Sequence, residues 1–368
     1  MREQFTYDAL PGRVVFGAGT ARTALADEVA RIGAARVLLI ATEQEEPLAR
    51  ELTARFADRI AATFTAVRPH VPTEVAEAAR ERAAAAGADL LLSVGGGSTT
   101  GTAKAIALTT GLPIMAVPTT YAGSEVTPVW GMTEGARKTT GVDQRVLPHC
   151  VVYDPELTLT LPVDLTMASG LNAMAHCVEA FWAPRRNPIS TLVAEEGIRA
   201  LGRGLPAVFD DPCGAGGRAD LLYGAYLAGS AFAVAGSGLH HKICHALGGA
   251  FDLPHAQTHA IVLPHVLAFN APAAPEATRR IAQALGRADA VAGLAELARR
   301  LGIPAGLREL GMRESQVDEV TDLVAPAVPA DNPRRVDRPA LRALIHAAWA
   351  GPHGRDATPT TPTYQGQT

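Results

Sequence analysis

Short apolar runs alternate with longer amphipathic stretches through the first part of the chain. Six runs have the length and aliphatic content typical of buried strands: residues 14–16, 37–41, 63–67, 90–94, 114–117 and 151–153. Helical periodicity is found between them, at residues 22–32, 46–56, 73–86 and 100–109. Strands that alternate with helices predict a parallel sheet covered by helices on both faces.

The pattern changes after Asp154 and Pro155. From residue 165 to residue 350 the apolar periodicity is helical, and segments rich in Pro, Gly and Asn interrupt it at 184–188, 212–217, 248–254, 302–311 and 325–333. We therefore predict an α/β N-terminal domain over residues 1–160 and an all-helical C-terminal domain over residues 161–355. The Thr- and Pro-rich tail, residues 356–368, is predicted to be disordered.

Composition narrows the class of protein. Hydrophobic residues make up 48% of the 368 positions and the formal net charge is −4, which is typical of a soluble globular protein. The sequence contains no apolar run of membrane-spanning length, no signal-peptide core and no basic stripe. We expect a cytoplasmic protein without a nucleic-acid or membrane partner. The four cysteines form no C-x-x-C pair, so we expect buried thiols rather than disulfides or a cysteine zinc site.

A glycine-rich turn follows the predicted strand at 90–94. Gly95, Gly96 and Gly97 allow close approach of backbone to a ligand, and the amides at the start of the next helix are suited to binding phosphate. Ser98 and Thr99 can cap that helix and donate hydroxyls. The spacing is not G-x-G-x-x-G, so the ordinary dinucleotide fingerprint is absent. A purely structural turn remains an alternative.

A second polar loop follows the next predicted strand and strengthens the case for a nucleotide site. Two such loops at the carboxyl ends of neighbouring parallel strands line the crevice where these sheets bind ligands. Glu43, after the strand at 37–41, is a candidate to accept hydrogen bonds from a ribose without a 2′-phosphate, and an exposed loop acid is an equal alternative. The second loop supplies these candidate cofactor-binding residues: Thr119, Thr120, Tyr121, Ser124 and Thr127.

Polar residues in the helical half are spaced for one face of a helix. Asn172 and His176 are four residues apart, as are His241 and His245, and His255 follows a Gly-Gly break. With a carboxylate at position 172, this set would suit a divalent metal. A neutral amide cannot supply the anionic ligand. The pattern indicates a metal-type site that works without the metal.

Lysine is nearly absent from the chain. Of 33 basic residues, only Lys104, Lys138 and Lys242 are lysines, and they lie beside the glycine turn, in a polar loop and between two histidines. Arginine cannot replace lysine where a compact ammonium is required, so these three positions are candidates for functional residues. Accidental retention is the alternative for each of them.

Taken together, these motifs resemble the iron-containing alcohol dehydrogenase superfamily, which includes glycerol dehydrogenase and dehydroquinate synthase. The resemblance extends over residues 14–269. It implies a dinucleotide-binding α/β half, a helical half and an active site between them. The segments that carry it are 95–98, 118–125, 154–157, 172–179 and 241–264.

The resemblance also assigns individual residues. The family's metal ligands fall on Asn172, His176, His241 and His255, and a further active-site histidine falls on His245. Two positions depart from the metal-dependent members: Asn172 replaces a carboxylate, and Gly101 stands where those members carry Asp. These variants resemble one branch, the maleylacetate reductases. They work without a metal and reduce a conjugated keto-diacid to 3-oxoadipate in the breakdown of aromatic compounds.

The chemistry of that branch fits the substitution. Hydride addition to a C=C bond conjugated to a ketone gives an enolate, which hydrogen-bond donors and a general acid can stabilise. Asn172 and the histidines at 176, 241, 245 and 255 are the expected catalytic residues. We expect NADH as cofactor with NADPH also possible, no metal, a small dicarboxylate substrate and a homodimer. The candidates for holding that substrate are Lys138, Arg145, Lys242 and Tyr121, and Lys138 is also a cofactor candidate.

Three other interpretations stay open from the sequence. In a metal-dependent alcohol or polyol dehydrogenase, Asn172 would ligate through its carbonyl oxygen. A lyase of the dehydroquinate synthase type and a non-catalytic nucleotide-binding module are less favoured. His240 is ambiguous, Tyr226 is expected in ordinary packing, and surface or capping positions are expected for His70, His149, His259 and His265.

Overall fold

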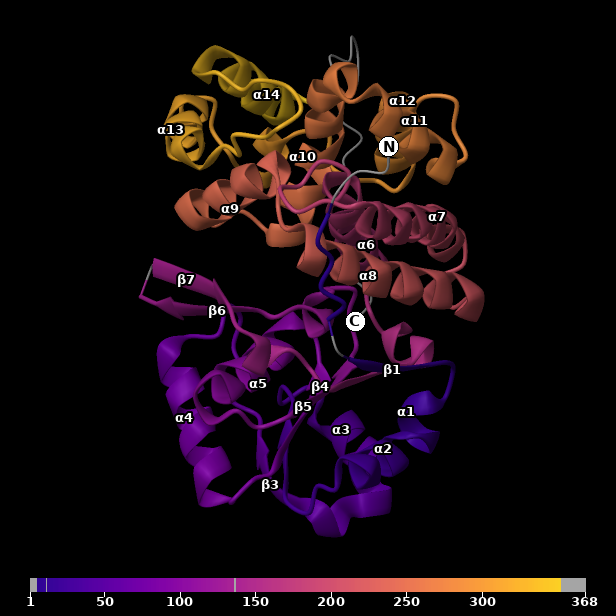
Figure 1. Cartoon of the computed structure of the whole chain (residues 1–368), viewed down its shortest axis with the longest axis vertical. Coiled ribbons are helices and arrows are strands. Elements are labelled where there is room, and N and C mark those ends of the chain that lie inside the picture. The colour runs from indigo at the N-terminus through magenta and orange to yellow at the C-terminus, as the bar shows by residue number, and fades with distance from the viewer. Residues whose placement is uncertain (1–4, 11, 136, 352–368) are drawn as a thin grey trace, which may run out of the picture.

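The computed structural model describes residues 5–10, 12–135 and 137–351, without the side chains of residues 137 and 138 (Figure 1). The predicted disordered tail, 356–368, lies outside the described residues. The chain forms an α/β half that is followed by a helical half, as the sequence pattern predicted. None of the described helices is by itself long and apolar enough to cross a membrane; α8 and α9 pass the test only as a pair bent by 101°.

Six parallel strands form the sheet of the N-terminal half, in the order β1-β8-β5-β4-β2-β3. Each predicted strand is present. The third begins three residues earlier than predicted, because Ile60 pairs with Val37 and the strand ends at Phe64. The bounds are β1 (Arg13–Phe16), β2 (Val37–Ile40), β3 (Ile60–Phe64), β4 (Leu90–Gly95), β5 (Ile114–Pro118) and β8 (Cys150–Tyr153).

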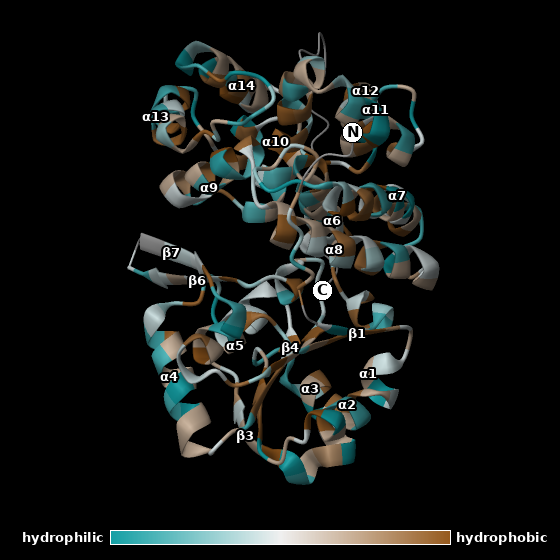
Figure 2. Cartoon of the chain, viewed as in Figure 1, coloured by the Kyte–Doolittle hydropathy of each residue, from teal (hydrophilic) through white to brown (hydrophobic). Residues whose placement is uncertain are grey.

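Helices cover both faces of the sheet because successive residues of its buried strands point to opposite sides. Leu39 packs with helices α2 and α3, whereas its neighbour Leu38 packs with α4 and α5. Figure 2 shows the hydrophobic residues gathered in the strands. The helices are α1 (Thr20–Thr23), α2 (Leu25–Ile32), α3 (Glu46–Thr53), α4 (Thr73–Ala85) and α5 (Gly97–Thr110), with a 3-10 helix η1 (Ala54–Arg59) after α3.

An antiparallel hairpin between β5 and β8 was not predicted. Strands β6 (Val129–Glu134) and β7 (Arg137–Val142) pair along their whole length. Their segment is rich in Thr and Gly and has little apolar alternation, so the sequence carries a weak strand signal. Figure 1 shows the hairpin extending from the α/β half on the side where α9 (Leu239–Phe251) faces it.

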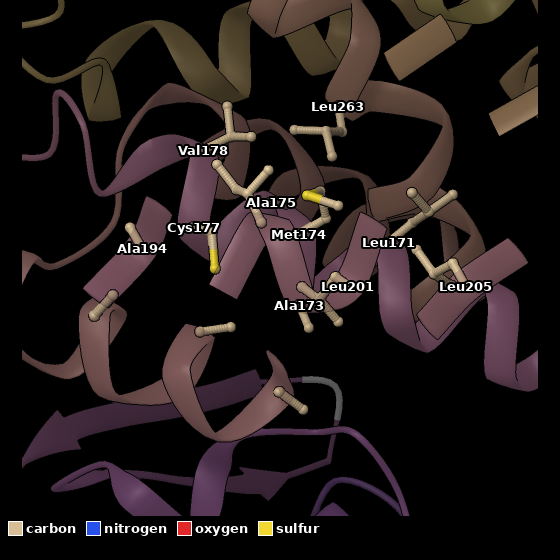
Figure 3. Packing of buried hydrophobic residues seen from close by; sticks show 14 of the residues in the cluster. Leu171, Ala173, Met174, Ala175, Cys177, Val178, Ala194, Leu201, Leu205 and Leu263 are labelled. Carbon is tan, nitrogen blue, oxygen red and sulfur yellow. The ribbon is translucent and has the colours of Figure 1, made fainter. Parts of the chain in front are cut away.

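The helical half is built around α6 (Val163–Glu179), which is buried on nearly all sides. Such a helix needs apolar or small residues all round, and the sequence of α6 supplies them. Figure 3 shows its side chains in one cluster with residues of α7 and α10. The other helices are α7 (Pro188–Asp210), α8 (Ala215–Ala235), α10 (His255–Asn270), α11 (Pro275–Leu285), α12 (Ala290–Arg300), α13 (Gln316–Val324) and α14 (Arg338–Ala350). Short 3-10 helices are η2 (Ser124–Val126), η3 (Gln144–Val146), η4 (Pro155–Thr158), η5 (Ala271–Ala273), η6 (Leu307–Leu310) and η7 (Ala325–Ala327).

The two halves meet through glycines. A Cβ atom on Gly229 of α8 would lie 2.5 Å from the carbonyl oxygen of Gly123, so only glycine allows this approach. Gly123 has a φ of 72° and lies in the loop after β5. Helix α8 therefore packs directly against the second polar loop, and this contact positions the helical half over the carboxyl edge of the sheet.

Candidate active site

The glycine turn joins β4 directly to α5. The helix begins at Gly97, three residues earlier than predicted, with Gly96 at its N-cap. Gly95 has a φ of 149°, and a Cβ atom there would lie 2.5 Å from both Glu45 Oε2 and Thr99 Oγ1. The turn therefore requires glycine at position 95. The unpaired amides of the first helical turn lie at the carboxyl edge of the sheet, in the geometry that favours an anion.

Glu45 ties together three strand ends beside this turn, and the sequence analysis missed it. Its carboxylate accepts hydrogen bonds from Thr119 Oγ1 at 2.8 Å and from Thr42 Oγ1 at 2.9 Å. Thr42 follows β2 and Thr119 follows β5, while Gly95 ends β4 between them. Glu45 lies two residues after Glu43, at the start of a helix, where an exposed acid is common. The sequence therefore gives no signal that distinguishes it from an ordinary surface residue.

Lys104 anchors the second polar loop. Its Nζ atom donates to the carbonyl oxygens of Ser124 at 2.6 Å, Thr127 at 2.8 Å and Val129 at 2.7 Å. Burial lowers the pKa of this lysine to about 7. A compact ammonium reaches three carbonyls at once, which explains why lysine is retained here. The hydroxyl of Thr127 also accepts from Lys104, so that candidate helps to hold the loop.

Tyr121 lies inside the protein rather than at a ligand-facing surface. Its side chain is fully buried, and its hydroxyl accepts a hydrogen bond from Arg218 at 3.3 Å. Glu125 is also buried and accepts from the hydroxyl of Tyr153 at 2.7 Å, and burial raises its pKa. These placements give Tyr121 and Glu125 packing roles within the loop. Thr119 is largely buried and Thr120 is partly exposed.

A cavity of about 400 Å³ lies beyond the carboxyl ends of β2 and β3. Glu43 is exposed on its wall, opposite residues that follow β3. The cavity is next to the Glu45 network and the glycine turn along the sheet edge. Its lining consists of Thr42, Glu43, Gln44, Thr65, Ala66, Val67 and Arg68.

Six imidazoles from three helices gather in the helical half. The ring of His176 on α6 stacks on that of His241 on α9, with centroids 4.6 Å apart. His245 lies one turn further along α9, 6.0 Å from His241, and 6.5 Å from His255 at the start of α10. His245 and His255 are exposed, whereas His241 is buried. The structure thus brings together the histidines that the spacing had grouped.

The fifth ring belongs to His259 and the sixth to its neighbour His240, and the position of His259 corrects a prediction. The sequence analysis expected a surface or capping position, but His259 is completely buried and its Nδ1 lies 2.9 Å from His240 Nε2. Its ring centroid is 4.4 Å from that of His255, because the two histidines are four residues apart on α10. That spacing was the available signal. His265 is partly buried, and His70 and His149 are exposed.

Glu179 is a second acidic residue that the sequence analysis missed. It lies at the end of α6, is fully buried and approaches His241 Nδ1 with its Oε2 at 2.5 Å. Burial raises the pKa of Glu179 to about 7, against the opposing effect of the backbone amides that it accepts from. Burial also lowers the pKa of His241 to about 3. The sequence signal that could have identified it is an acid three residues after a candidate histidine in the same predicted helix.

The residues present do not fit a tightly held divalent metal. Buried atoms without a hydrogen-bond partner among the described residues include Asn172 Oδ1, His176 Nδ1 and His241 Nε2, as expected for a ligand-facing group. The set lacks an anion, however, and within the described part of the chain His176, His241 and His255 do not form a group of three whose ligand atoms all lie within 4.8 Å of one another. The residues that do so are His240, Cys244 and His259.

The second departure from metal-dependent relatives also has a structural basis. A Cβ atom on Gly101 would lie 2.8 Å from Val71 Cγ2, and Val71 is buried. An aspartate at position 101 therefore has no space unless Val71 moves. Both positions at which the metal-dependent relatives carry an acid are therefore neutral in this chain.

The cationic candidates differ in their surroundings. Arg145 is exposed and its guanidinium donates to Asp143 at 3.0 Å and 2.7 Å. Lys242 on α9 is partly buried, and its ammonium has no hydrogen bond or ion pair within the described part of the chain. The side chain of Lys138 lies outside the described atoms, although its backbone pairs with Thr133 in the hairpin.

The family models for iron-containing alcohol dehydrogenases match both halves of the chain. The model for the N-terminal part matches residues 11–155, and the one for the C-terminal part matches residues 166–349. The chain therefore belongs to the iron-containing alcohol dehydrogenase family, a family of oxidoreductases.

Relatives within the family are similar over nearly the whole chain. The maleylacetate reductase of Sphingobium indicum is 49% identical over 95% of this chain and 98% of its own length, and that of Burkholderia cepacia is 47% identical over 94% and 98%. Among solved structures, an iron-containing alcohol dehydrogenase from Corynebacterium glutamicum has a TM-score of 0.93 at 53% identity, covering 95% and 98% of the two chains. The maleylacetate reductase of Agrobacterium tumefaciens has a TM-score of 0.91 at 46% identity, covering 95% and 99%.

Proposed function

We propose that this protein reduces maleylacetate to 3-oxoadipate with a nicotinamide cofactor and without a metal. The observation that carries this proposal is Asn172, a neutral residue at the one carboxylate position of an otherwise imidazole-rich site. Relatives named maleylacetate reductase, 43–49% identical over about 95% of the chain, support the same activity. The site lies where the α/β half meets the helical half, and we place the boundary between β8 and α6.

The carboxyl edge of the sheet is the proposed cofactor site. Gly96, Gly97 and Ser98 present the first amides of α5 to the pyrophosphate. The cavity beside Glu43 receives the adenosine ribose, whose 2′-hydroxyl can donate to that carboxylate. A phosphate at the same position would be repelled, so NADH is the preferred cofactor and NADPH the poorer one. The second polar loop would hold the nicotinamide end of the cofactor.

The reaction is a hydride addition followed by a proton transfer. A bound reduced nicotinamide would supply the hydride, and the electron pair of its C4–H bond would form the new C–H bond at the alkene carbon furthest from the ketone. The displaced π electrons move onto the ketone oxygen and give an enolate. His241 contacts that oxygen, and the exposed His245 delivers a proton to the carbon next to the ketone and regains one from water. Asn172, His176 and His255 complete the polar surroundings.

We assign one substrate carboxylate to Lys242. Its ammonium lies on the same helix as His241 and His245, and no acceptor among the described residues neutralises it. Arg145 is already paired with Asp143, so it would have to leave that pair in order to bind substrate. Lys138 stays a candidate through its place on β7.

The test is NADH oxidation by the purified protein with maleylacetate, with and without a strong chelator, together with metal analysis. We expect turnover that the chelator does not change and a metal content well below one per chain. Loss of turnover on chelation with rescue by iron or zinc would overturn the metal-free part and favour a metal-dependent alcohol dehydrogenase. Absence of NADH oxidation with maleylacetate in a folded protein would overturn the activity itself.

A further inference from the structure

The guanidinium of Arg218 is buried, and no carboxylate forms an ion pair with it in the described part of the chain. Only 1% of the residue is exposed. Its Nε donates to the carbonyl oxygen of Pro212 at 3.1 Å, and Nη2 donates to that of Leu161 at 3.2 Å. Nη1 donates to the hydroxyls of Thr166 at 3.0 Å and Tyr121 at 3.3 Å. All four acceptors are neutral.

The four acceptors come from four separate segments of the chain. Tyr121 lies in the second polar loop, Leu161 in the connection between the two halves, Thr166 in the first turn of α6 and Pro212 between α7 and α8. Arg218 itself lies in the first turn of α8. One side chain of the helical half therefore ties α8 to the polar loop of the α/β half.

Helix α8 contacts the second polar loop at two points. Gly229 packs on Gly123, and Arg218 binds the hydroxyl of Tyr121. Arg218 and Gly229 are eleven residues apart, which is close to three full turns of a helix, so they lie on the same face of α8. This face of α8 determines where residues 121–123 of the loop lie.

Thr120 connects this contact with the glycine turn. It precedes Tyr121, and a Cβ atom on Gly96 would lie 3.1 Å from Thr120 Cγ2 and 3.3 Å from Thr120 Oγ1. Gly96 is the N-cap of α5, whose first amides form the proposed pyrophosphate site. A displacement of Tyr121 would carry Thr120 with it and change the space beside these amides.

A buried cation without an acidic partner is costly, because it leaves water without gaining an opposite charge. Apolar residues of similar volume often stabilise a protein as well as buried ionic groups do, so stability alone does not require arginine here. An apolar residue cannot bind four segments at once, since this takes the several donors of a guanidinium. The main effect of Arg218 is therefore expected in where these segments lie.

We propose that Arg218 is a positioning residue of the cofactor site, which holds Tyr121 so that Thr120 leaves room for a dinucleotide beside Gly96. This inference rests on the proposed function for the nature of the ligand. Arg218 acts through Tyr121 and, being completely buried, does not itself contact the cofactor or the substrate. The inward-facing hydroxyl of Tyr121 thus has a role in cofactor binding without touching the cofactor.

Two matched substitutions separate positioning from stability. Tyr121→Phe removes the hydroxyl acceptor on the polar loop, and Thr166→Val removes the one on α6. Both leave the same buried nitrogen of Arg218 with one acceptor fewer, so both should lower the free energy of unfolding. A purely structural role predicts unchanged cofactor affinity in both variants, whereas positioning predicts weaker binding in Tyr121→Phe alone.

The first measurement is the Kd for NADH by fluorescence titration, which needs no turnover, together with urea unfolding of each variant. The second is the KM for NADH and kcat with maleylacetate. Arg218→Met and the double variant Arg218→Met with Tyr121→Phe complete a thermodynamic cycle. If Arg218→Met does not fold, the two hydroxyl variants decide the question by themselves.

We expect the Kd for NADH to rise about three- to tenfold in Tyr121→Phe, the range for one hydrogen bond, and less than about twofold in Thr166→Val. The KM for NADH should follow the Kd, with a smaller change in kcat, because the histidines lie on other helices. In the Arg218→Met background, Tyr121→Phe should add less than about twofold.

An unchanged Kd in Tyr121→Phe, an equal rise in Thr166→Val, or additive effects in the cycle would overturn the proposal. A wild-type protein that binds NADH but does not reduce maleylacetate would refute the proposed reaction, and the expected pattern of Kd values would still establish the positioning role. A folded wild-type protein without affinity for NADH would overturn both.

Discussion

His259 and His240 form a hydrogen-bonded imidazole pair inside the helical half. Nδ1 of His259 lies 2.9 Å from Nε2 of His240, and both side chains are completely buried. Burial lowers the pKa values of both rings well below the ordinary histidine value, so the pair is neutral in the folded protein. The pair lies between α9 and α10 and joins the two helices that carry His241, His245 and His255.

Replacing His259 with phenylalanine should therefore reduce stability. An aromatic ring is retained, but Nε2 of His240 loses its imidazole partner and keeps only the weak contact with Cys244 Sγ at 3.7 Å, and a buried polar group left without a good partner costs about 1–3 kcal/mol. Urea unfolding of His259→Phe against the wild type measures this loss. The exposed His149→Phe is the matched control and should change the free energy of unfolding by less than about 0.5 kcal/mol. Equal stability of His259→Phe and wild type would mean that the pair contributes nothing to the folded state.

Lys104→Met should loosen the second polar loop. Three backbone carbonyls lose their shared donor, so the free energy of unfolding should fall by at least about 1–3 kcal/mol, and the KM for NADH should rise. Lys104→Arg should not restore either value, because a planar guanidinium does not fit a site built around a compact ammonium. Thr109→Val on the exposed part of α5 is the control. A fully functional arginine variant would contradict this explanation of the retained lysine.

Gly96→Val should block cofactor binding. A Cβ atom there lies 3.1 Å from Thr120 Cγ2, and a branched side chain fills the space in which a pyrophosphate would approach the amides of α5. We expect the affinity for NADH, measured by fluorescence titration, to fall more than about tenfold, which corresponds to about 1.4 kcal/mol. Gly216→Ala, which meets no atom within 4 Å, is the control. A folded Gly96→Val variant with normal NADH affinity would leave the turn with a structural role only.

Alanine at His245 should lower kcat for maleylacetate by about 100-fold, the usual scale for the loss of a general acid. Because this side chain is exposed, the free energy of unfolding should change by less than about 0.5 kcal/mol. Steady-state kinetics and urea unfolding of the same preparation separate the two effects. The exposed His70→Ala is the control. Near-normal kcat in the His245 variant would remove it from the proposed proton transfer.

Lys242→Met should raise the KM for maleylacetate by about tenfold or more and leave NADH affinity nearly unchanged. The ammonium is the proposed partner of a substrate carboxylate, and a charge-assisted hydrogen bond is worth about 1.5–3 kcal/mol. The KM for maleylacetate is also measured in the Arg145→Met and Lys138→Met variants. A larger rise in either of these would transfer the assignment to that residue. Wild-type KM in all three variants would mean that hydroxyls and backbone amides hold the carboxylates.

Local patterns in the sequence were sufficient for the order of the elements. The parallel sheet followed from aliphatic runs such as 37–41 and 90–94, because a strand buried on both faces needs apolar residues throughout. The i, i+4 pairs Asn172–His176 and His241–His245 were visible because helical spacing depends only on positions along one element. The hairpin β6–β7 was missed, since its pairing is between two weakly patterned strands.

The supporting residues of the site were decided by the tertiary structure. Glu45 has ordinary sequence surroundings, and the helical spacing of Glu179 and His259 from other histidines does not reveal their partners. The roles of all three arise from contacts with residues 74, 62 and 19 positions away. Such contacts depend on how whole helices and strands pack, which no local pattern records. The sequence determined which helices and strands form and which helix faces carry imidazoles. Packing determined which carboxylate contacts which imidazole ring, because hydrogen bonds act over about 3 Å and here join segments that are distant in the chain.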